Sequence, residues 1–134
     1  MTTIFLVCTV HGEAGTASAN QLYEILCTIN PDVVFLEVPS GAIDSQTLEN
    51  MKNNLESKAI RLLKTNHQVK LVPVDLPTPS LDFFENYERV HREVKAKSIR
   101  YRQLVDNYST RLRKHGFYYL NSEYCSNDLS LIHI

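Results

Sequence analysis

The chain has 134 residues and a net charge of −1, and 43% of its residues are hydrophobic and 22% are charged. This length suits one domain, and this composition excludes wholesale disorder and low-complexity sequence. No apolar run approaches the roughly 20 residues that span a bilayer, and the first residues lack the basic start of a secretory signal peptide. The three cysteines, Cys8, Cys27 and Cys125, are too far apart in sequence to suggest a disulfide framework. We therefore expect a cytoplasmic protein without a membrane partner.

The first part of the sequence alternates short apolar runs with helical patterns. Residues 4–8 and 33–36 are apolar on both faces of an extended chain, which predicts strands buried in a parallel sheet. Residues 69–74 predict a third strand. Between these runs, apolar residues at helical spacing predict one helix after Ser18 and another after Asp44. The order predicts an α/β fold with a short parallel sheet of about three strands from a βαβαβ unit.

A long helical region is expected to follow. Residues 81–114 contain neither Gly nor Pro, and they predict a helix over about residues 81–115 that stops at Gly116. A helix of roughly 34 residues would be ~50 Å long, so it must bend, break or project from a domain of this size. We expect a core over residues 1–79 and a helical extension over residues 80–134, both in one domain.

Charge and apolar spacing suggest a role for this helical region. Residues 1–88 carry a net charge of −6, whereas residues 89–114 carry +7. One side of the expected helix has an apolar residue at every seventh position: Tyr87, Val94, Tyr101 and Tyr108. We therefore expect a homo-oligomer formed through residues 81–115. Because the tyrosines lie on this apolar side, the pattern does not favour nucleic acid as a partner.

Polar residues follow each expected strand. His11 comes after the first strand, Glu37 after the second and Asp75 after the third, and Glu13 lies beside His11. The carboxyl ends of parallel strands form a crevice in open α/β sheets. We therefore expect His11, Glu37 and Asp75 to bind a divalent metal ion such as Mn²⁺, Zn²⁺ or Mg²⁺. Such an ion acidifies a bound water, and Glu37 or Glu13 is then the candidate catalytic carboxylate.

Each of these residues also has a purely structural interpretation. His11 can donate to a backbone carbonyl, and Glu37 can pair with a cation or with the start of a helix. Asp75 can cap the turn that follows it, and Glu13 can be solvated. The cysteines are expected to be packed or solvated residues, because nothing beside them in the sequence favours a cysteine nucleophile.

Two segments near the N-terminus resemble a known family. Residues 8–11 read CTVH and residues 31–37 read PDVVFLE. They resemble the opening of TraB/PrgY/GumN-type proteins, in which a strand leads into G-x-x-H and a later strand ends in glutamate. The resemblance implies a metal-dependent hydrolase, with peptide as a candidate substrate, and it places His11 and Glu37 in the site. It also implies an N-terminal portion or a shortened member, because the family's proteins are longer.

A second hypothesis is a catalytically inactive interaction module that oligomerises through the long basic amphipathic helix. Cys8 stands where the family motif has glycine, which favours this hypothesis. The enzyme requires the side chains of His11, Glu37 and Asp75 within ~5 Å of a common point. The interaction module requires only an apolar helix face that contacts a second chain.

Overall fold

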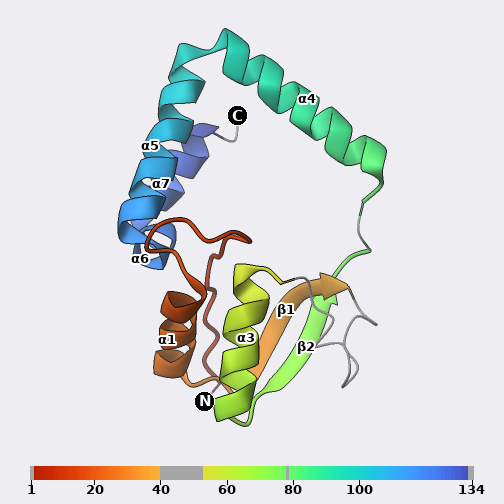
Figure 1. Ribbon diagram of the computed structural model, residues 1–134, viewed down its shortest axis with the longest axis vertical. Coiled ribbons are helices and arrows are strands. Elements are labelled where there is room, and N and C mark those ends of the chain that lie inside the picture. The colour runs from red at the N-terminus through yellow and green to blue at the C-terminus, as the bar shows by residue number, and fades with distance from the viewer. Residues whose placement is uncertain (1, 40–52, 78, 133–134) are drawn as a thin grey trace.

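The computed structural model describes residues 2–39, 53–77 and 79–132 (Figure 1). Within these residues, the first half of the fold contains α1 (Ala19–Ile29), β1 (Val33–Pro39), α3 (Leu55–Asn66) and β2 (Lys70–Asp75). Four helices form the second half: α4 (Leu81–Lys97), α5 (Ile99–His115), α6 (Phe117–Leu120) and α7 (Glu123–Ile132). The predicted helix start at Asp44 lies outside the described residues.

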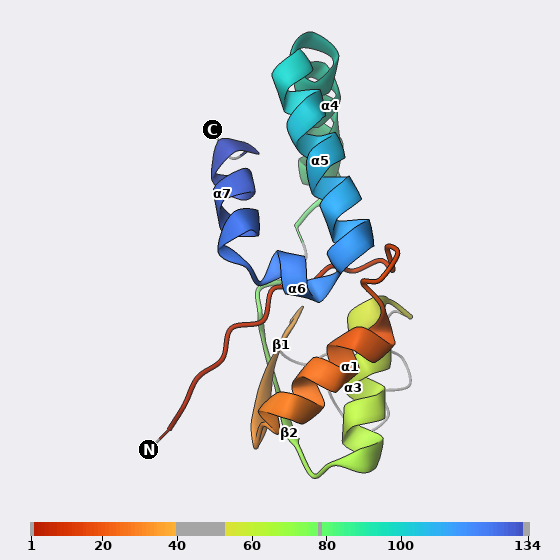
Figure 2. The same ribbon diagram turned by 90° about the vertical axis from the view of Figure 1, so that its left-hand side faces the viewer.

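The strands β1 and β2 pair in parallel, as the βαβ pattern predicts. Val34 is opposite Leu71, and the register becomes irregular between Leu36 and Pro39. The helices α1 and α3 lie side by side on one face of this sheet (Figure 2). Val34 and Leu36 pack into the core beneath the helices, whereas the neighbouring Phe35 is exposed on the other face. The mixed helix and strand character of the chain is therefore confirmed.

The first predicted strand, residues 4–8, is not part of this sheet. Within the described residues the sheet contains β1 and β2 alone, so about three strands is not confirmed. Ile4 and Leu6 are 86% and 89% exposed, and the segment leaves the body of the molecule in Figure 2. The Cys8 N–H donates to Asn121 Oδ1 at 2.7 Å, and Asn121 Nδ2 donates to the Cys8 carbonyl at 3.2 Å. Asn121 thus pairs with the backbone N–H and carbonyl of Cys8, which a neighbouring strand would otherwise use.

The long helix predicted over residues 81–115 breaks at Ser98. This residue has φ −114° and ψ 110°, ends α4 and begins α5. Its hydroxyl accepts from the Tyr101 N–H at 3.1 Å. Serine favours such a break because its side chain satisfies an N–H at the start of a new helix. The region is helical as predicted, but α4 turns away from α5 instead of continuing it (Figure 1).

A single hydrophobic core joins the two halves. Leu22 of α1 and Leu63 of α3 belong to the same cluster as Phe117 and Cys125, both of which have no exposed surface. The side-chain oxygen of Gln21 also accepts from the Phe117 N–H at 2.9 Å, which ties α1 to α6. Residues 80–134 therefore contribute to the core of residues 1–79. None of the helices in the described ranges is both long enough and apolar enough to cross a membrane.

The loop between residues 11 and 18 packs tightly against the end of α5. The Thr16 N–H donates to the Arg113 carbonyl at 2.9 Å. Gly15 has φ +59°, and a Cβ at this position would lie 2.2 Å from the Arg113 carbonyl oxygen. Both the positive φ and the close approach require glycine. This packing fixes the loop that carries His11 and Glu13.

Candidate functional site

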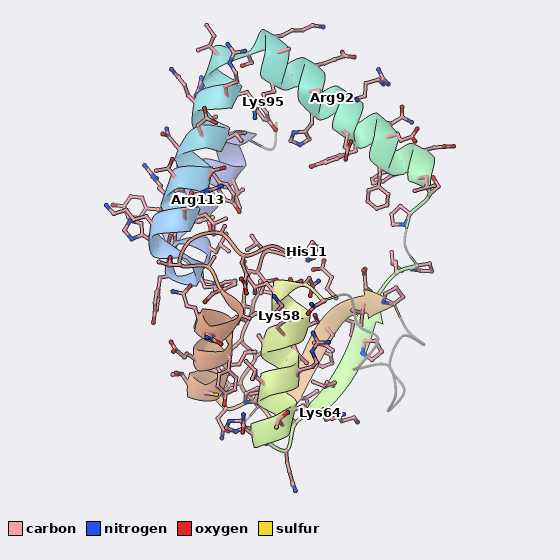
Figure 3. The ribbon with its side chains drawn as sticks, in the orientation of Figure 1. His11, Lys58, Lys64, Arg92, Lys95 and Arg113 are labelled. Atoms are coloured by element: carbon pink, nitrogen blue, oxygen red, sulfur yellow. The ribbon has the colours of Figure 1, made fainter. Side chains whose placement is uncertain are left out.

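The loop that carries His11 contacts the first turn of α3. His11 Nδ1 lies 2.6 Å from Glu56 Oε2. The His11 carbonyl accepts from the Leu55 N–H at 3.1 Å. In Figure 3, His11 lies at the upper end of α3, near Lys58. The histidine is therefore tied to α3 through both its backbone and its side chain.

Local sequence explains why Glu56 is available at this position. Asn54 caps α3, and its Oδ1 accepts from the Ser57 N–H at 2.9 Å. Glu56 then falls in the first turn, where the positive end of the helix favours a carboxylate. Its Oε1 accepts from the Thr9 hydroxyl, and Asn54 Nδ2 donates to its Oε2 at 3.4 Å. One carboxylate thus orients both Thr9 and His11.

The contact with Glu56 determines how the His11 ring can act. A carboxylate at Nδ1 favours the tautomer with the proton on Nδ1 and the lone pair on Nε2. The same pairing orients metal-binding histidines and histidines that act as general bases. The His11 side chain is 76% exposed, whereas that of Glu56 is 22% exposed. The arrangement therefore holds an exposed imidazole against a more buried carboxylate.

Glu13 is near this pair in sequence but has a different partner. Its Oε1 lies 3.8 Å from Lys58 Nζ, and both side chains are about half exposed. Glu13 and Lys58 line a shallow hollow of about 520 Å³ between α1 and α3, with Ser18, Ala19, Asn20, Arg61, Leu62 and Thr65. An exposed ion pair of this length contributes little stability. Glu13 is therefore placed on a surface hollow and does not contact Glu56.

The remaining predicted ligands lie on the strands. Glu37 is exposed on β1, and Asp75 ends β2. The Asp75 carboxylate accepts from the Leu76 N–H at 2.7 Å, which is the turn-capping role that the sequence also suggested. Among the residues that the structure describes, no three His, Cys, Asp or Glu side chains are grouped to hold a metal ion. His11, Glu37 and Asp75 are therefore not assembled into the predicted ligand set.

The missing third strand explains this difference. The prediction placed His11 at the sheet edge because residues 4–8 were expected to form a strand of the same parallel sheet. Since these residues lie outside the sheet, His11 is positioned by the first turn of α3 instead. The sequence analysis missed Glu56 for a related reason. A helix that starts at Asp44 would place Glu56 in its middle, whereas Asn54 followed by an acidic residue is itself a helix-start signal.

Comparison with known proteins adds no relative to these observations. The sequence matches no protein-family model, and neither the curated proteins nor the solved structures give a match. The contacts of His11 with Glu56 and the exposed surface of α4 are therefore the features on which a function can be proposed.

Proposed function

We propose that the chain is a metal-dependent hydrolase of the TraB-like type in which His11 is one metal ligand. The 2.6 Å contact between His11 Nδ1 and Glu56 Oε2 carries the proposal. Metal-ligating histidines typically donate their second ring N–H to such a group, which fixes the ring and raises its basicity. A divalent ion would supply an acidified water. The resemblance at residues 8–11 independently suggested a ligand at His11.

The roles of the other residues are parts of the same proposal. Glu56 accepts the Nδ1–H of His11 in a hydrogen bond, and the Thr9 hydroxyl donates to the other oxygen of Glu56. Glu37 and Asp75 are not grouped with His11 in this structure, so they could serve as further ligands only after a rearrangement that brings the strands to the His11 loop. Glu37 or Glu13 is the proposed general base. A peptide is the candidate substrate.

Metal content tests this proposal. Wild type, His11→Ala and Glu56→Gln are dialysed against trace Mn²⁺ and Zn²⁺ and measured by plasma mass spectrometry. We expect near-stoichiometric metal in the wild type, none in His11→Ala, and about 10- to 100-fold weaker binding in Glu56→Gln. His115→Ala is the matched control, because His115 is an exposed histidine at the end of α5. Equal metal content in wild type and His11→Ala would show that His11 is not a ligand.

A second proposal, self-association through the helical region, is carried by α4. None of its residues is buried. Its exposed large apolar side chains are Leu81, Phe83, Phe84, Tyr87, Val90 and Val94. Four of these recur at spacings of four, three and four residues, so they share one side of the helix: Phe83, Tyr87, Val90 and Val94. An apolar helix side of this kind is typical of helix pairing.

The charges of α4 favour an antiparallel pair of chains. The first half of the helix carries Asp82, Glu85 and Glu88, and the second half carries one acidic residue, Glu93, with four basic residues, Arg89, Arg92, Lys95 and Lys97. Antiparallel packing places the acidic half of each copy beside the basic half of the other, whereas parallel packing places like charges together. We propose a homodimer in which Phe83 of one copy meets Val94 of the second, and Tyr87 meets Val90.

Cross-linking distinguishes the two orientations. In a background with Cys8→Ser and Cys27→Ser, chains with Phe83→Cys are mixed with chains carrying Val94→Cys and treated with a short bis-maleimide. We expect cross-links only in the mixture, because in an antiparallel pair two copies of Phe83→Cys lie roughly 16 Å apart along the axis. Mixed Glu85→Cys and Arg92→Cys chains are the control, since these positions lie on the opposite side of α4. Cross-linking of Phe83→Cys alone would indicate parallel pairing, and a monomer in light scattering would contradict self-association.

A further inference from the structure

A second group of reactive side chains lies at the end of α3 that is remote from His11. Cys27 Sγ of α1 lies 3.5 Å from His67 Nε2, and both side chains are partly buried. His67 caps the C-terminus of α3, where its N–H donates to the Leu63 carbonyl at 2.8 Å. The position of the imidazole is therefore fixed by the helix end, and the thiol meets it from the neighbouring helix.

Two more side chains complete the surroundings of the sulfur. Tyr23 lies one turn before Cys27 on α1, and its hydroxyl accepts from Asn66 Nδ2 at 3.2 Å. A hydrogen bond with the Cys27 side chain, followed by desolvation, raises the pKa of Tyr23. The phenol is therefore a second polar neighbour of the sulfur. His67 approaches the thiol from α3, with 3.5 Å between Cys27 Sγ and His67 Nε2.

Helix geometry indicates how the pair would react. Cys27 lies in the last turn of α1, and the negative end of a helix disfavours a thiolate, so the sulfur needs a base as it attacks. His67 is placed to be that general base, which is the usual way a cysteine is activated by a neighbouring histidine.

The surface beside His67 indicates the charge of the reaction partner. His67 lines a shallow hollow of about 460 Å³ with Lys64, Gln68, Val69 and Lys70. Lys64 lies in the last turn of α3, at the lower end of that helix in Figure 3, and Lys70 begins β2. Two lysines beside a nucleophile attract an anionic reactant.

We propose that Cys27 and His67 form a nucleophilic pair that undergoes thiol–disulfide exchange with a small anionic disulfide. His67 Nε2 takes the thiol proton while Cys27 Sγ attacks one sulfur of the disulfide. The disulfide bond of the reactant breaks, and a mixed disulfide on Cys27 forms. The second half of the reactant leaves as a thiolate and takes up the proton from His67. The disulfide is the only oxidant, and this site is independent of His11.

The kinetics of thiol labelling test the proposal on the full chain. The probe is 5,5′-dithiobis(2-nitrobenzoate), a dianionic disulfide, and the parent protein carries Cys8→Ser so that the exposed Cys8 does not contribute. Cys125 is fully buried and serves as an internal sensor of unfolding. We expect one thiol to react, and His67→Gln to lower its rate at pH 7 about tenfold or more. Cys27→Ser should abolish the labelling.

Matched measurements separate each part of the pair. In a Cys27→Ser protein that retains Cys8, His67→Gln should leave the rate of Cys8 unchanged. Lys64→Gln with Lys70→Gln should slow the dianionic probe several-fold at low salt and leave neutral 2,2′-dithiodipyridine unaffected. A second reacting thiol in His67→Gln would show that this substitution loosens the fold. The labelling rate of Cys27 is then measured in Tyr23→Phe instead, and a rate equal to that of the parent protein would count against the proposal. An unchanged rate in folded His67→Gln over pH 6 to 8, or labelling that persists in Cys27→Ser, would overturn the proposal.

Discussion

Replacing Glu56 with glutamine tests the contact on which the candidate site depends. The glutamine side chain has the same size as the glutamate, but its amide provides only one oxygen in place of two. Thr9 donates to Oε1 and His11 Nδ1 contacts Oε2, so the amide nitrogen of glutamine must replace the acceptor of one of them. Glu56→Gln therefore removes one charge-assisted hydrogen bond and the negative charge in the first turn of α3.

The expected loss of stability follows from these two contributions. A hydrogen bond to a charged group contributes about 1.5 to 3 kcal/mol when it is shielded, and the 76% exposure of His11 reduces this to about 1 kcal/mol. The charge near the helix N-terminus adds about 0.5 kcal/mol. We therefore expect Glu56→Gln to lower the free energy of unfolding by about 1.5 kcal/mol, which is a shift in the urea midpoint of roughly 0.8 M.

Urea unfolding followed by circular dichroism measures this change. Glu24→Gln is the matched control, because Glu24 is an exposed carboxylate on α1; it should change stability by less than ~0.5 kcal/mol. A cycle that combines Glu56→Gln with His11→Ala should give a coupling energy of about 1 kcal/mol. A Glu56→Gln protein as stable as Glu24→Gln, together with no coupling to His11, would refute the contact between Glu56 and His11.

Three further predictions concern the packing that supports the site. Gly15→Ala should lower the free energy of unfolding by about 2 kcal/mol or more, because it forces a side chain into positive φ and against the Arg113 carbonyl. Gly12→Ala is the control, since nothing lies within 4 Å of its Cβ position. Equal effects of the two substitutions in thermal melts would contradict the prediction. Phe117→Ala should lower the free energy of unfolding by about 3 to 5 kcal/mol, because Phe117 is fully buried. Tyr118 is 73% exposed, so Tyr118→Ala should change the free energy measured by urea unfolding very little. Burial, and then a hydrogen bond to Asp128, raise the pKa of Tyr119, so the folded chain keeps the phenol proton above pH ~10, where the unfolded chain loses it. Stability should therefore fall as the pH rises above about 10, and Tyr119→Phe should flatten this fall; identical slopes in the two proteins would disprove it.

The elements with strong local signals could be predicted from the sequence. The hydroxyl of Ser18 accepts from the Gln21 N–H at 3.2 Å, so α1 begins where its capping residues indicate. It ends at Asn30, which has φ 48° and precedes Pro31. Residues near Val34 and Leu71 pair as parallel strands, in agreement with their apolar runs. The ends of α1 depend on neighbours in sequence, and each strand is marked by its own apolar run, although their pairing is between distant residues.

Most differences arise where distant residues determine the outcome, whereas the break at Ser98 is local. Residues 4–8 have the composition of a strand, but their end is held by Asn121, which lies 113 residues further along the chain. Ser98 breaks a helix that its neighbours would continue, because its own side chain caps α5. His11 was singled out from the sequence, whereas its partner Glu56, 45 residues away, became evident only once the loop was packed on α3.

The most direct test of the central claim is nitrogen-15 NMR of the His11 imidazole, recorded with and without Zn²⁺. The account predicts that the metal-free ring carries its proton on Nδ1, and that Zn²⁺ shifts the Nε2 resonance while Nδ1 stays protonated. In Glu56→Gln the tautomer preference and the Zn²⁺ response should both weaken, whereas the His115 resonances should be unchanged. A His11 ring protonated on Nε2, or a ring that does not respond to Zn²⁺ in the wild type, would contradict a metal-binding role for His11.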